Sequence, residues 1–167
     1  MVPIVSVADE RSPDDSPDVA VDTERWRRLA AAVLADQAAR GELALTFVDA
    51  DEIAELNAEY LASSGPTDVL AFPLDDPPPA DTSPGGVPAL LGDVVVSPAV
   101  AAGQFAQHAG SLDDEFALLV VHGILHVLGH DHAEPAETAV MRARELDLLE
   151  RFHWHGPAPS SFRQHHD

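Results

Sequence analysis

The stretch HGILHVLGHDH, residues His122–His132, decides the fold and the chemistry of this chain. His122 and His126 are four residues apart, so on a helix both side chains project from one face, within reach of one metal ion. Gly129 follows three residues later, where a helix can end with a glycine in the left-handed conformation. That turn can bring His132 back as a third ligand. Three protein ligands and one open position are typical of a catalytic zinc site, so the motif predicts a metal-dependent hydrolase.

The apolar residues around this motif predict that its helix is buried. Residues 116–121 are all apolar, and four more apolar residues lie within the motif. A helix that is apolar on every face belongs in a core, where two imidazoles cost desolvation free energy unless something satisfies them. His130 fits the ligand geometry less well and is interpreted as a flank of the turn. Asp131 is either a carboxylate that orients a ligating imidazole or a simple turn residue.

The spacing of the histidines also occurs in metzincin proteases, which carry a glutamate directly after the first histidine as the general base. This chain has Gly123 at that position, and glycine has no side chain that accepts a proton. The ligand set is therefore present without the protease base. Glutamate-dependent hydrolysis of a peptide is not expected at this site.

Three stretches resemble, in order, the YbeY family of bacterial endoribonucleases. They are PTDVLAFP at residues 66–73, LGDVVV at residues 91–96 and the histidine motif itself. LNAEY at residues 56–60 is similar to the family's preceding helix, and the resemblance extends over about residues 43–152. It implies a single-strand-specific, metal-dependent endoribonuclease of 16S rRNA 3′-end maturation and ribosome quality control. The implied partners are rRNA, the small ribosomal subunit, and a ribosomal protein or a ribosome-associated GTPase.

One position departs from the family pattern. Many members carry an arginine directly after the aromatic residue at the position of Tyr60, and this arginine is thought to act on the RNA phosphate. This chain has Leu61 there. Either this branch of the family lacks that contact, or another arginine replaces it.

Length and composition limit the alternatives. The 167 residues suit one ordinary domain, and we expect it to span residues 1–155, followed by a polar tail at residues 156–167. There is no cysteine, so a thiolate metal site is excluded and the ligands must be His, Asp or Glu. No stretch approaches the roughly 18 apolar residues of a membrane helix, and no leader peptide is evident, which favours a soluble, cytoplasmic protein.

The net charge of -20 opposes direct binding of RNA. Affinity for polyphosphates comes largely from Lys and Arg, and here 29 acidic residues face 9 basic ones, all of them arginine. These arginines either lie on solvent-exposed helix faces, or some of them form a local positively charged groove beside the metal. The candidates for such a groove are Arg25, Arg27, Arg28, Arg40, Arg142, Arg144 and Arg151.

Hydrophobic periodicity predicts an α+β fold, a small mixed sheet of about four strands packed against a central metal-bearing helix. The strands are expected at residues 3–8, 43–48, 69–72 and 91–97. Helices are expected at residues 24–39, from residue 49 or 51 onward, at residues 98–108, across the histidine motif and at residues 137–152. Ser111 is the expected cap of the motif's helix, with Asp114 three residues on in the manner of a capping box.

Three neutral imidazoles would leave a zinc ion its full charge, which lowers the pKa of a bound water from near 15.7 to about 7. Asp131 is the first candidate proton acceptor, and Asp68 and Asp93 are further ones that also suit a turn and a strand end. For RNA the 2′-hydroxyl is a competing nucleophile. Two other functions stay open, a metallohydrolase of a peptide or amide and a ribosome-assembly protein whose metal is mainly structural. The sequence identifies no substrate-binding residue.

Overall fold

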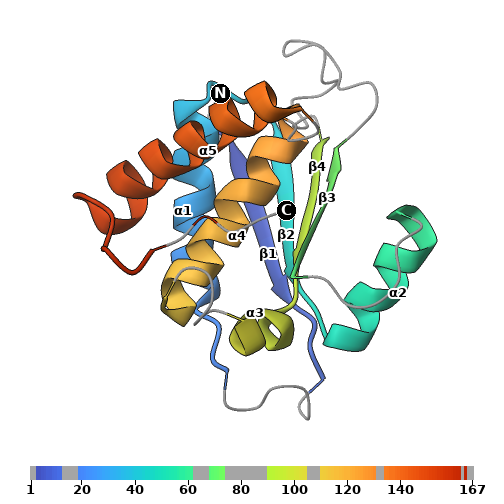
Figure 1. Ribbon diagram of the computed structural model, residues 1–167. Helices are drawn as coiled ribbons and strands as arrows, with labels where there is room; N and C mark the ends of the chain where they lie inside the picture. Colours follow the sequence, from blue (N-terminus) through green and yellow to red (C-terminus); the bar gives the residue numbers. More distant parts are fainter. Residues whose placement is uncertain are drawn as a thin grey trace.

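Within the described residues, four strands form one mixed sheet in the order β1-β2-β4-β3 (Figure 1). The computed structural model describes residues 3–12, 19–61, 68–73, 90–104, 110–130, 134–162 and 164, without the side chains of residues 60 and 61. The strands are β1 (Ile4–Asp9), β2 (Glu42–Phe47), β3 (Val69–Pro73) and β4 (Leu90–Val96). β1, β2 and β4 are parallel, and β3 runs antiparallel to β4.

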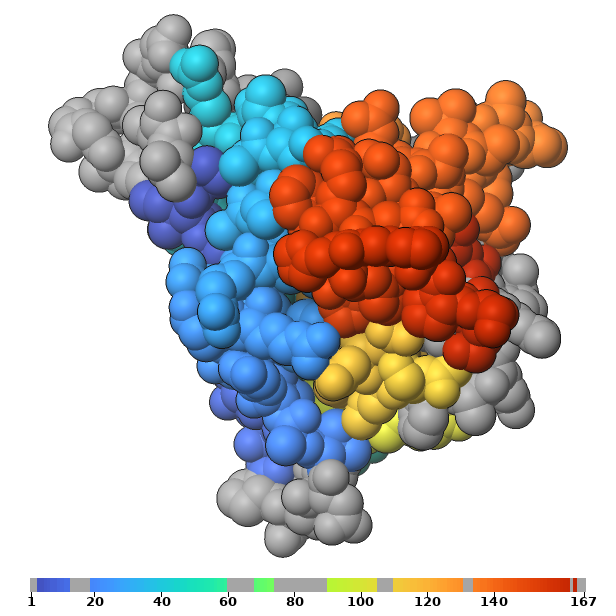
Figure 2. Space-filling view, turned by 90° about the vertical axis from the view of Figure 1, so that its left-hand side faces the viewer, coloured from blue at the N-terminus to red at the C-terminus, as the bar shows by residue number. Residues whose placement is uncertain are grey.

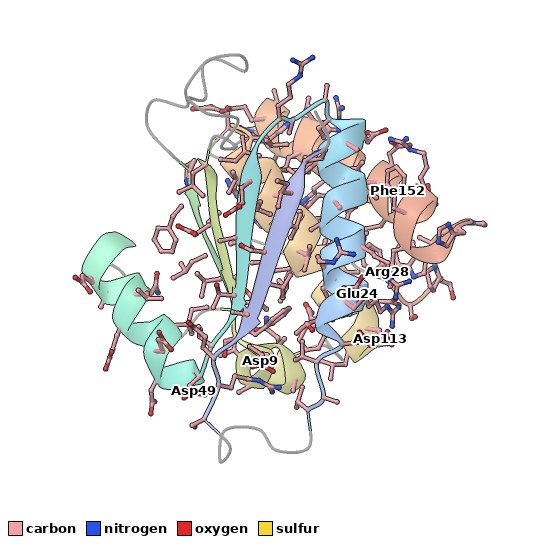
Figure 3. All side chains as sticks on the ribbon, turned by 180° about the vertical axis from the view of Figure 1, so that it is seen from behind. Asp9, Glu24, Arg28, Asp49, Asp113 and Phe152 are labelled. Carbon is pink, nitrogen blue, oxygen red and sulfur yellow. The ribbon has the colours of Figure 1, made fainter. Side chains whose placement is uncertain are left out.

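Helices cover the two faces of the sheet unequally. The helices are α1 (Thr23–Asp36), α2 (Ala50–Leu61), α3 (Pro98–Gln104), α4 (Leu112–Val127), α5 (Pro135–Leu149) and the π-helical turn η3 (Glu150–Trp154). On one face α4 contacts β3 and β4, α1 lies beside it, and α5 packs on α4 from outside (Figure 1). The other face, seen from behind in Figure 3, carries only α2 among the described helices. Helix α4 is therefore the central element.

Alternation along the strands separates a large core from a small one. Leu43, Leu45 and Phe47 of β2 are fully buried towards α1 and α4, as the pleat of a strand requires for every second residue. The small core lies between the sheet and α2, and its buried members are Val48, Ile53, Leu70 and Val95. The α+β fold with a four-stranded sheet predicted from the sequence is confirmed.

The first turn of α4 is fixed by side chains. Ser111 Oγ accepts a hydrogen bond from the backbone N–H of Asp114 at 3.2 Å, which confirms the predicted cap. The carboxylate of Asp114, expected to close a capping box, accepts hydrogen bonds from His153 Nε2 at 2.8 Å and Trp154 Nε1 at 2.9 Å. The chain after α5 is thereby attached to the beginning of α4.

The limits of two helices differ from the prediction. Helix α1 ends at Asp36 rather than at residue 39, because Ala38 adopts a positive φ of 56°. Helix α5 starts at Pro135 and continues as η3 to Trp154. Part of the expected polar tail is packed, since the Phe162 ring lies edge-on to that of Trp154 with centroids 4.7 Å apart. No helix among the described residues is long and apolar enough to cross a membrane.

An ion pair joins α1 to η3, which follows α5 and lies beside α1 on the face shown in Figure 2. Arg151 donates to both oxygens of Asp36, at 2.7 and 2.9 Å, and this hydrogen bonding holds the pKa of Asp36 below its ordinary value. A carboxyl whose pKa is lowered on folding stabilises the fold above its unfolded pKa. That stabilisation is lost as the pH falls through the lowered value.

We therefore predict that Arg151→Met raises the pKa of Asp36 towards the ordinary carboxyl value of about 3.9. The midpoint of acid unfolding should move to higher pH for the same reason. Carboxyl ¹³C NMR titration and acid unfolding measure the two effects. Arg28→Met, which removes an exposed arginine 3.9 Å from Glu24, is the matched control and should leave Asp36 unchanged. An Asp36 pKa that does not move in the Arg151 variant contradicts this account of the ion pair.

Candidate functional site

Two imidazoles converge on the second half of α4. The ring centroids of His122 and His126 are 4.6 Å apart with the rings at 74° to each other. His122 is buried, with 7% of its surface exposed, whereas His126 is half-buried. The predicted spacing therefore places both rings on one face of the helix, where the buried helix approaches solvent.

A carboxylate from another helix supports the first imidazole. Glu145 of α5 is 2% exposed, and its Oε2 lies 2.8 Å from Nδ1 of His122. An ionised carboxylate only accepts hydrogen bonds, so this contact suits an imidazole that carries its hydrogen on Nδ1 and its lone pair on Nε2. Sequence reasoning missed Glu145. The signal was present, because Glu145 falls in line with Met141 and Leu149 on the buried stripe of α5.

The end of α4 is built as the sequence predicted. Gly129 has a φ of +103°, its N–H donates to the carbonyl of His126 at 3.0 Å, and the N–H of His130 donates to the carbonyl of Leu125 at 2.9 Å. These two bonds form a Schellman motif, which reverses the chain directly after the helix. His130 lines a small surface hollow together with Glu137. His132 and Asp131 lie outside the described residues, so their roles stay predictions.

Gly123 brings α4 close to the sheet. A Cβ atom at this position would lie 2.6 Å from Val94 Cγ1 and 3.4 Å from Val69 Cγ2. Any side chain here would collide with the Val94 side chain of β4. The position of the protease glutamate is therefore occupied by glycine in this chain, and the packing against Val94 leaves no room for a glutamate there.

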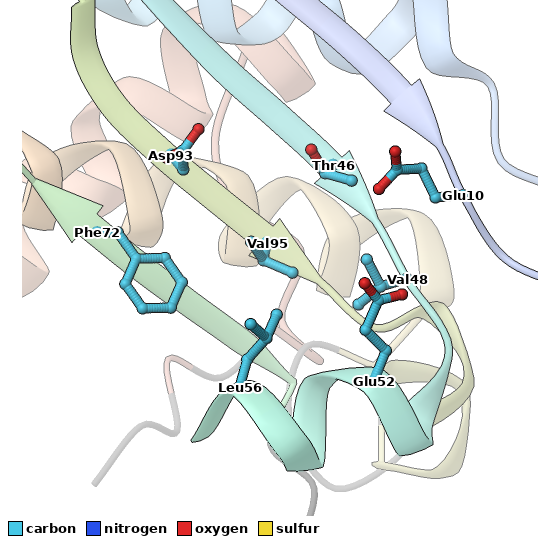
Figure 4. Close-up of a pocket in the computed structure, with 8 residues that line it drawn as sticks. All are labelled: Glu10, Thr46, Val48, Glu52, Leu56, Phe72, Asp93 and Val95. Atoms are coloured by element: carbon cyan, nitrogen blue, oxygen red, sulfur yellow. The ribbon is translucent and has the colours of Figure 1, made fainter. Parts of the chain in front are cut away.

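Two further aspartates were candidate proton acceptors, and the structure places neither with the histidines. Asp68 accepts a hydrogen bond from the side-chain amide of Gln104. Asp93 lies next to Val94 in β4, so its side chain projects from the face of the sheet opposite to α4. There it lines a groove of about 400 Å³ with Thr46 and Phe72 (Figure 4). Among its described lining residues this groove has carboxylates and no basic side chain, which does not suit a phosphate.

Four of the seven arginines expected as a possible positive groove pair with carboxylates, namely Arg25, Arg27, Arg28 and Arg151. On α1, Arg27 and Arg28 both lie against Glu24, which Figure 3 shows beside Arg28. Their guanidinium groups lower the pKa of Glu24, mainly through its hydrogen bond with Arg27. Arg25 pairs with Asp113 at 3.0 Å. These pairs offset the positive charge of α1 at its surface.

The donor set fits a divalent metal. Imidazole is a usual ligand of zinc, and a ligating histidine usually gives its second ring hydrogen to a carboxylate or carbonyl. The carboxylate of Glu145 lies within hydrogen-bond distance of Nδ1 of His122 and can accept such a bond. Within the described residues no group of three His, Asp or Glu side chains is gathered closely enough to hold an ion by itself. The third ligand that the sequence predicts, His132, lies outside the described residues.

The fold and the site define a single-domain α+β protein whose central helix carries two imidazoles backed by a buried carboxylate. Comparison with known families matches residues 13–153 to the family described as Endoribonuclease YbeY. The chain belongs to the YbeY family.

Individual relatives agree with this assignment. Endoribonuclease YbeY of Salinispora tropica is 49% identical over 113 residues, covering 65% of this chain and 72% of the relative. The Thermobifida fusca protein of the same name is 43% identical, covering 78% and 86%, and that of Nocardia farcinica is 45% identical, covering 67% and 62%. The solution structure of TM1509 from Thermotoga maritima has the same fold, with a TM-score of 0.60, 22% identity and 91% coverage of each chain.

We predict that Gly123→Ala destabilises the protein through the contact with Val94. Overpacking costs about 1–3 kcal/mol, and the better helix propensity of alanine returns up to about 1 kcal/mol. The net loss should be about 1–2 kcal/mol of unfolding free energy, measured by urea unfolding with a chelator present. In a Val94→Ala background the same change should be neutral or stabilising. Equal destabilisation in both backgrounds contradicts the contact.

Proposed function

We propose that this chain is a metal-dependent endoribonuclease that cleaves single-stranded RNA, and that His122, His126 and His132 hold one zinc ion. The observation that carries the proposal is the pair of converging imidazoles on α4, one of them backed by Glu145, in a chain of the YbeY family. When bound, a divalent metal supplies a Lewis acid that stabilises charge on a phosphodiester and makes a water molecule more acidic.

The residues of the chain have separate roles in this proposal. His122 and His126 bind the ion from the buried helix α4, and the turn at Gly129 ends this helix. The third proposed ligand, His132, follows this turn in the sequence. Asp131 orients a ligand or takes a proton from the nucleophile. That nucleophile is water or the 2′-hydroxyl of the RNA. Hydrolysis of a peptide is not favoured, because the contact of Gly123 with Val94 leaves no room for the glutamate base.

The natural substrate in this proposal is rRNA of the small ribosomal subunit in the cytoplasm, at the 3′ end of 16S rRNA. A ribosomal protein or a ribosome-associated GTPase is the proposed partner that presents this RNA. The acidic surface of the chain supports a need for such a partner, since the described arginines of α1 already face carboxylates.

The direct test is cleavage of a defined single-stranded RNA by zinc-loaded protein. His122→Ala should abolish cleavage, and His130→Ala, which removes the neighbouring histidine of the turn, is the matched control and should retain it. An RNA with one 2′-deoxy nucleotide at the cleavage position separates the two nucleophiles. Cleavage that persists there requires water, and cleavage that stops there requires the 2′-hydroxyl. A folded, zinc-containing protein that cleaves no RNA, free or in ribosomal particles, would instead favour a structural metal.

We predict about one zinc per chain in the wild type. His126→Ala and His132→Ala should lose most of it, whereas His130→Ala should keep it. The reason is the Schellman turn at Gly129, which ends the helix, so that we expect His130 and His132 to point in different directions. Elemental analysis of protein purified without a metal-affinity tag measures the content. Wild-type protein without metal, or equal zinc affinity of the His130 and His132 variants, contradicts the ligand assignment.

We also predict that cleavage is much faster on rRNA within a small-subunit particle than on the same segment as a free oligonucleotide. Few phosphate contacts should give a shallow salt dependence, because each contact adds roughly -0.7 to the logarithmic slope for single strands. Cleavage rates on both substrates across a salt series measure this. Tight, steeply salt-dependent binding of the free oligonucleotide that is lost in an Arg27→Gln, Arg28→Gln, Arg142→Gln variant would refute the partner-dependent model.

A further inference from the structure

The carboxylate of Glu145 is buried at the contact between α4 and α5. Removing a carboxylate from water costs several kcal/mol unless charge and hydrogen bonds compensate it. Glu145 is nevertheless 2% exposed, and its Oε2 lies 2.8 Å from Nδ1 of His122, itself 7% exposed. A leucine would fill a similar volume on the buried stripe of α5 beside Leu148 and Leu149 without this cost. The position of the charge therefore points to a role beyond packing.

That role follows from the chemistry of the pair. In water a neutral histidine exchanges its hydrogen between the two ring nitrogens. Against an ionised carboxylate only the Nδ1–H form makes the hydrogen bond, and the rotation of the ring is fixed by the same contact. Nε2 then carries the lone pair in a set orientation. His126, 4.6 Å away between ring centroids, lies on the same face of α4.

The other oxygen of Glu145 meets the C-terminal segment. The side-chain amide of Gln164 donates to the carbonyl of Arg142 at 2.7 Å and lies 3.5 Å from Oε1 of Glu145. The segment is held nearby by Phe162 on Trp154 and by Ser161, which lies where a Cβ atom of Gly110 would come within 3.1 Å. Gln164 is beyond residue 153, where the match to the family ends. This outer contact thus lies outside the part of the chain that the family model matches.

We propose that Glu145 is a positioning residue that fixes the Nδ1–H tautomer and the orientation of His122, and that Gln164 holds the outer oxygen of Glu145. The consequence for zinc affinity rests on the proposed metal site. The consequence for the imidazole does not, because the tautomer exists in the metal-free protein.

The first experiment is ¹⁵N NMR of the imidazoles in metal-free, full-length protein at a pH of about 8, where an ordinary histidine is neutral. The His122 signals are assigned by their loss in His122→Gln. In the wild type we expect Nδ1 to be protonated and Nε2 to be unprotonated. Glu145→Leu should lose this preference, and Asp147→Asn, which removes an exposed carboxylate of the same helix, should keep it. A wild-type His122 in the Nε2–H form overturns the proposal.

The second experiment compares zinc affinity, by competition with a chelator, with the stability of the metal-free protein. Glu145→Leu should bind zinc about 10–100-fold more weakly, as expected for loss of a carboxylate behind a ligating histidine. Its metal-free form should also be less stable than the wild type, because removal of one partner of a buried pair leaves the His122 imidazole without its acceptor, so the zinc affinity is the deciding measurement. A purely structural Glu145 predicts lower stability with an unchanged zinc affinity of the folded protein. Glu145→Gln keeps the shape of the side chain and one hydrogen-bond acceptor, so it should lose less zinc affinity than Glu145→Leu. It replaces the leucine variant in this comparison if that variant does not fold.

These outcomes separate this inference from the proposed function. If the wild type shows the Nδ1–H tautomer but binds no zinc, the metal-dependent function fails and the positioning of His122 stands. If the wild type binds zinc but Glu145→Leu changes neither the tautomer of His122 nor the zinc affinity, the positioning role fails and the metal site stands. Gln164→Ala should weaken zinc binding less than Glu145→Gln does, and an unchanged affinity in Gln164→Ala removes Gln164 from the proposal.

Discussion

At Gly123, helix α4 lies so close to the sheet that a Cβ atom would be 2.6 Å from Val94 Cγ1. A larger residue at this position would require the Val94 side chain to shift. The close approach lets most residues of α4 be buried between the sheet, α1 and α5. The large core is organised around this helix. Gly123 also occupies the position at which metzincin proteases carry their glutamate base. The residue that allows the close packing of α4 is therefore also the one that leaves the site without this base.

Burial of α4 also determines how its histidines are held. An imidazole within an apolar helix needs a polar partner, and the neighbouring residues of α4 are apolar. The partner of His122 is Glu145 of α5. Glu145 lies on the buried stripe of α5, where the helical periodicity would predict an apolar side chain. The site is therefore a product of the contact between two helices. Its geometry depends on how α5 docks on α4 and on what holds the chain after α5 in place.

The distribution of charge opposes direct binding of RNA. The net charge is -20, and the arginines of α1 lie against Glu24 and Asp113. The groove on the second face of the sheet is lined by acidic and apolar side chains, including Asp93. The histidine pair is on the other face of the sheet, away from this groove. Specificity through a partner that presents the RNA is consistent with this arrangement.

The sequence by itself determined the elements whose signals are local. Alternating residues located the strands, Ser111 capped α4, and Gly129 ended it with the Schellman turn, because each of these features involves residues within five positions of one another. The spacing of His122 and His126 predicted their common face for the same reason. His132 as third ligand and the role of Asp131 stay predictions.

Tertiary structure alone decided the features that join distant segments. Glu145 contacts the imidazole of His122 although the two residues are 23 positions apart. Asp114 similarly accepts a hydrogen bond from His153, which is 39 positions away. The continuation of α5 into η3 and the packing of Phe162 similarly depend on the surface that α4 and α5 present. Asp93 was left with two possible roles until the pleat of β4 assigned it to the face without α4. Periodicity and capping cannot reveal such contacts, because they are set by which faces meet when helices and sheet pack together.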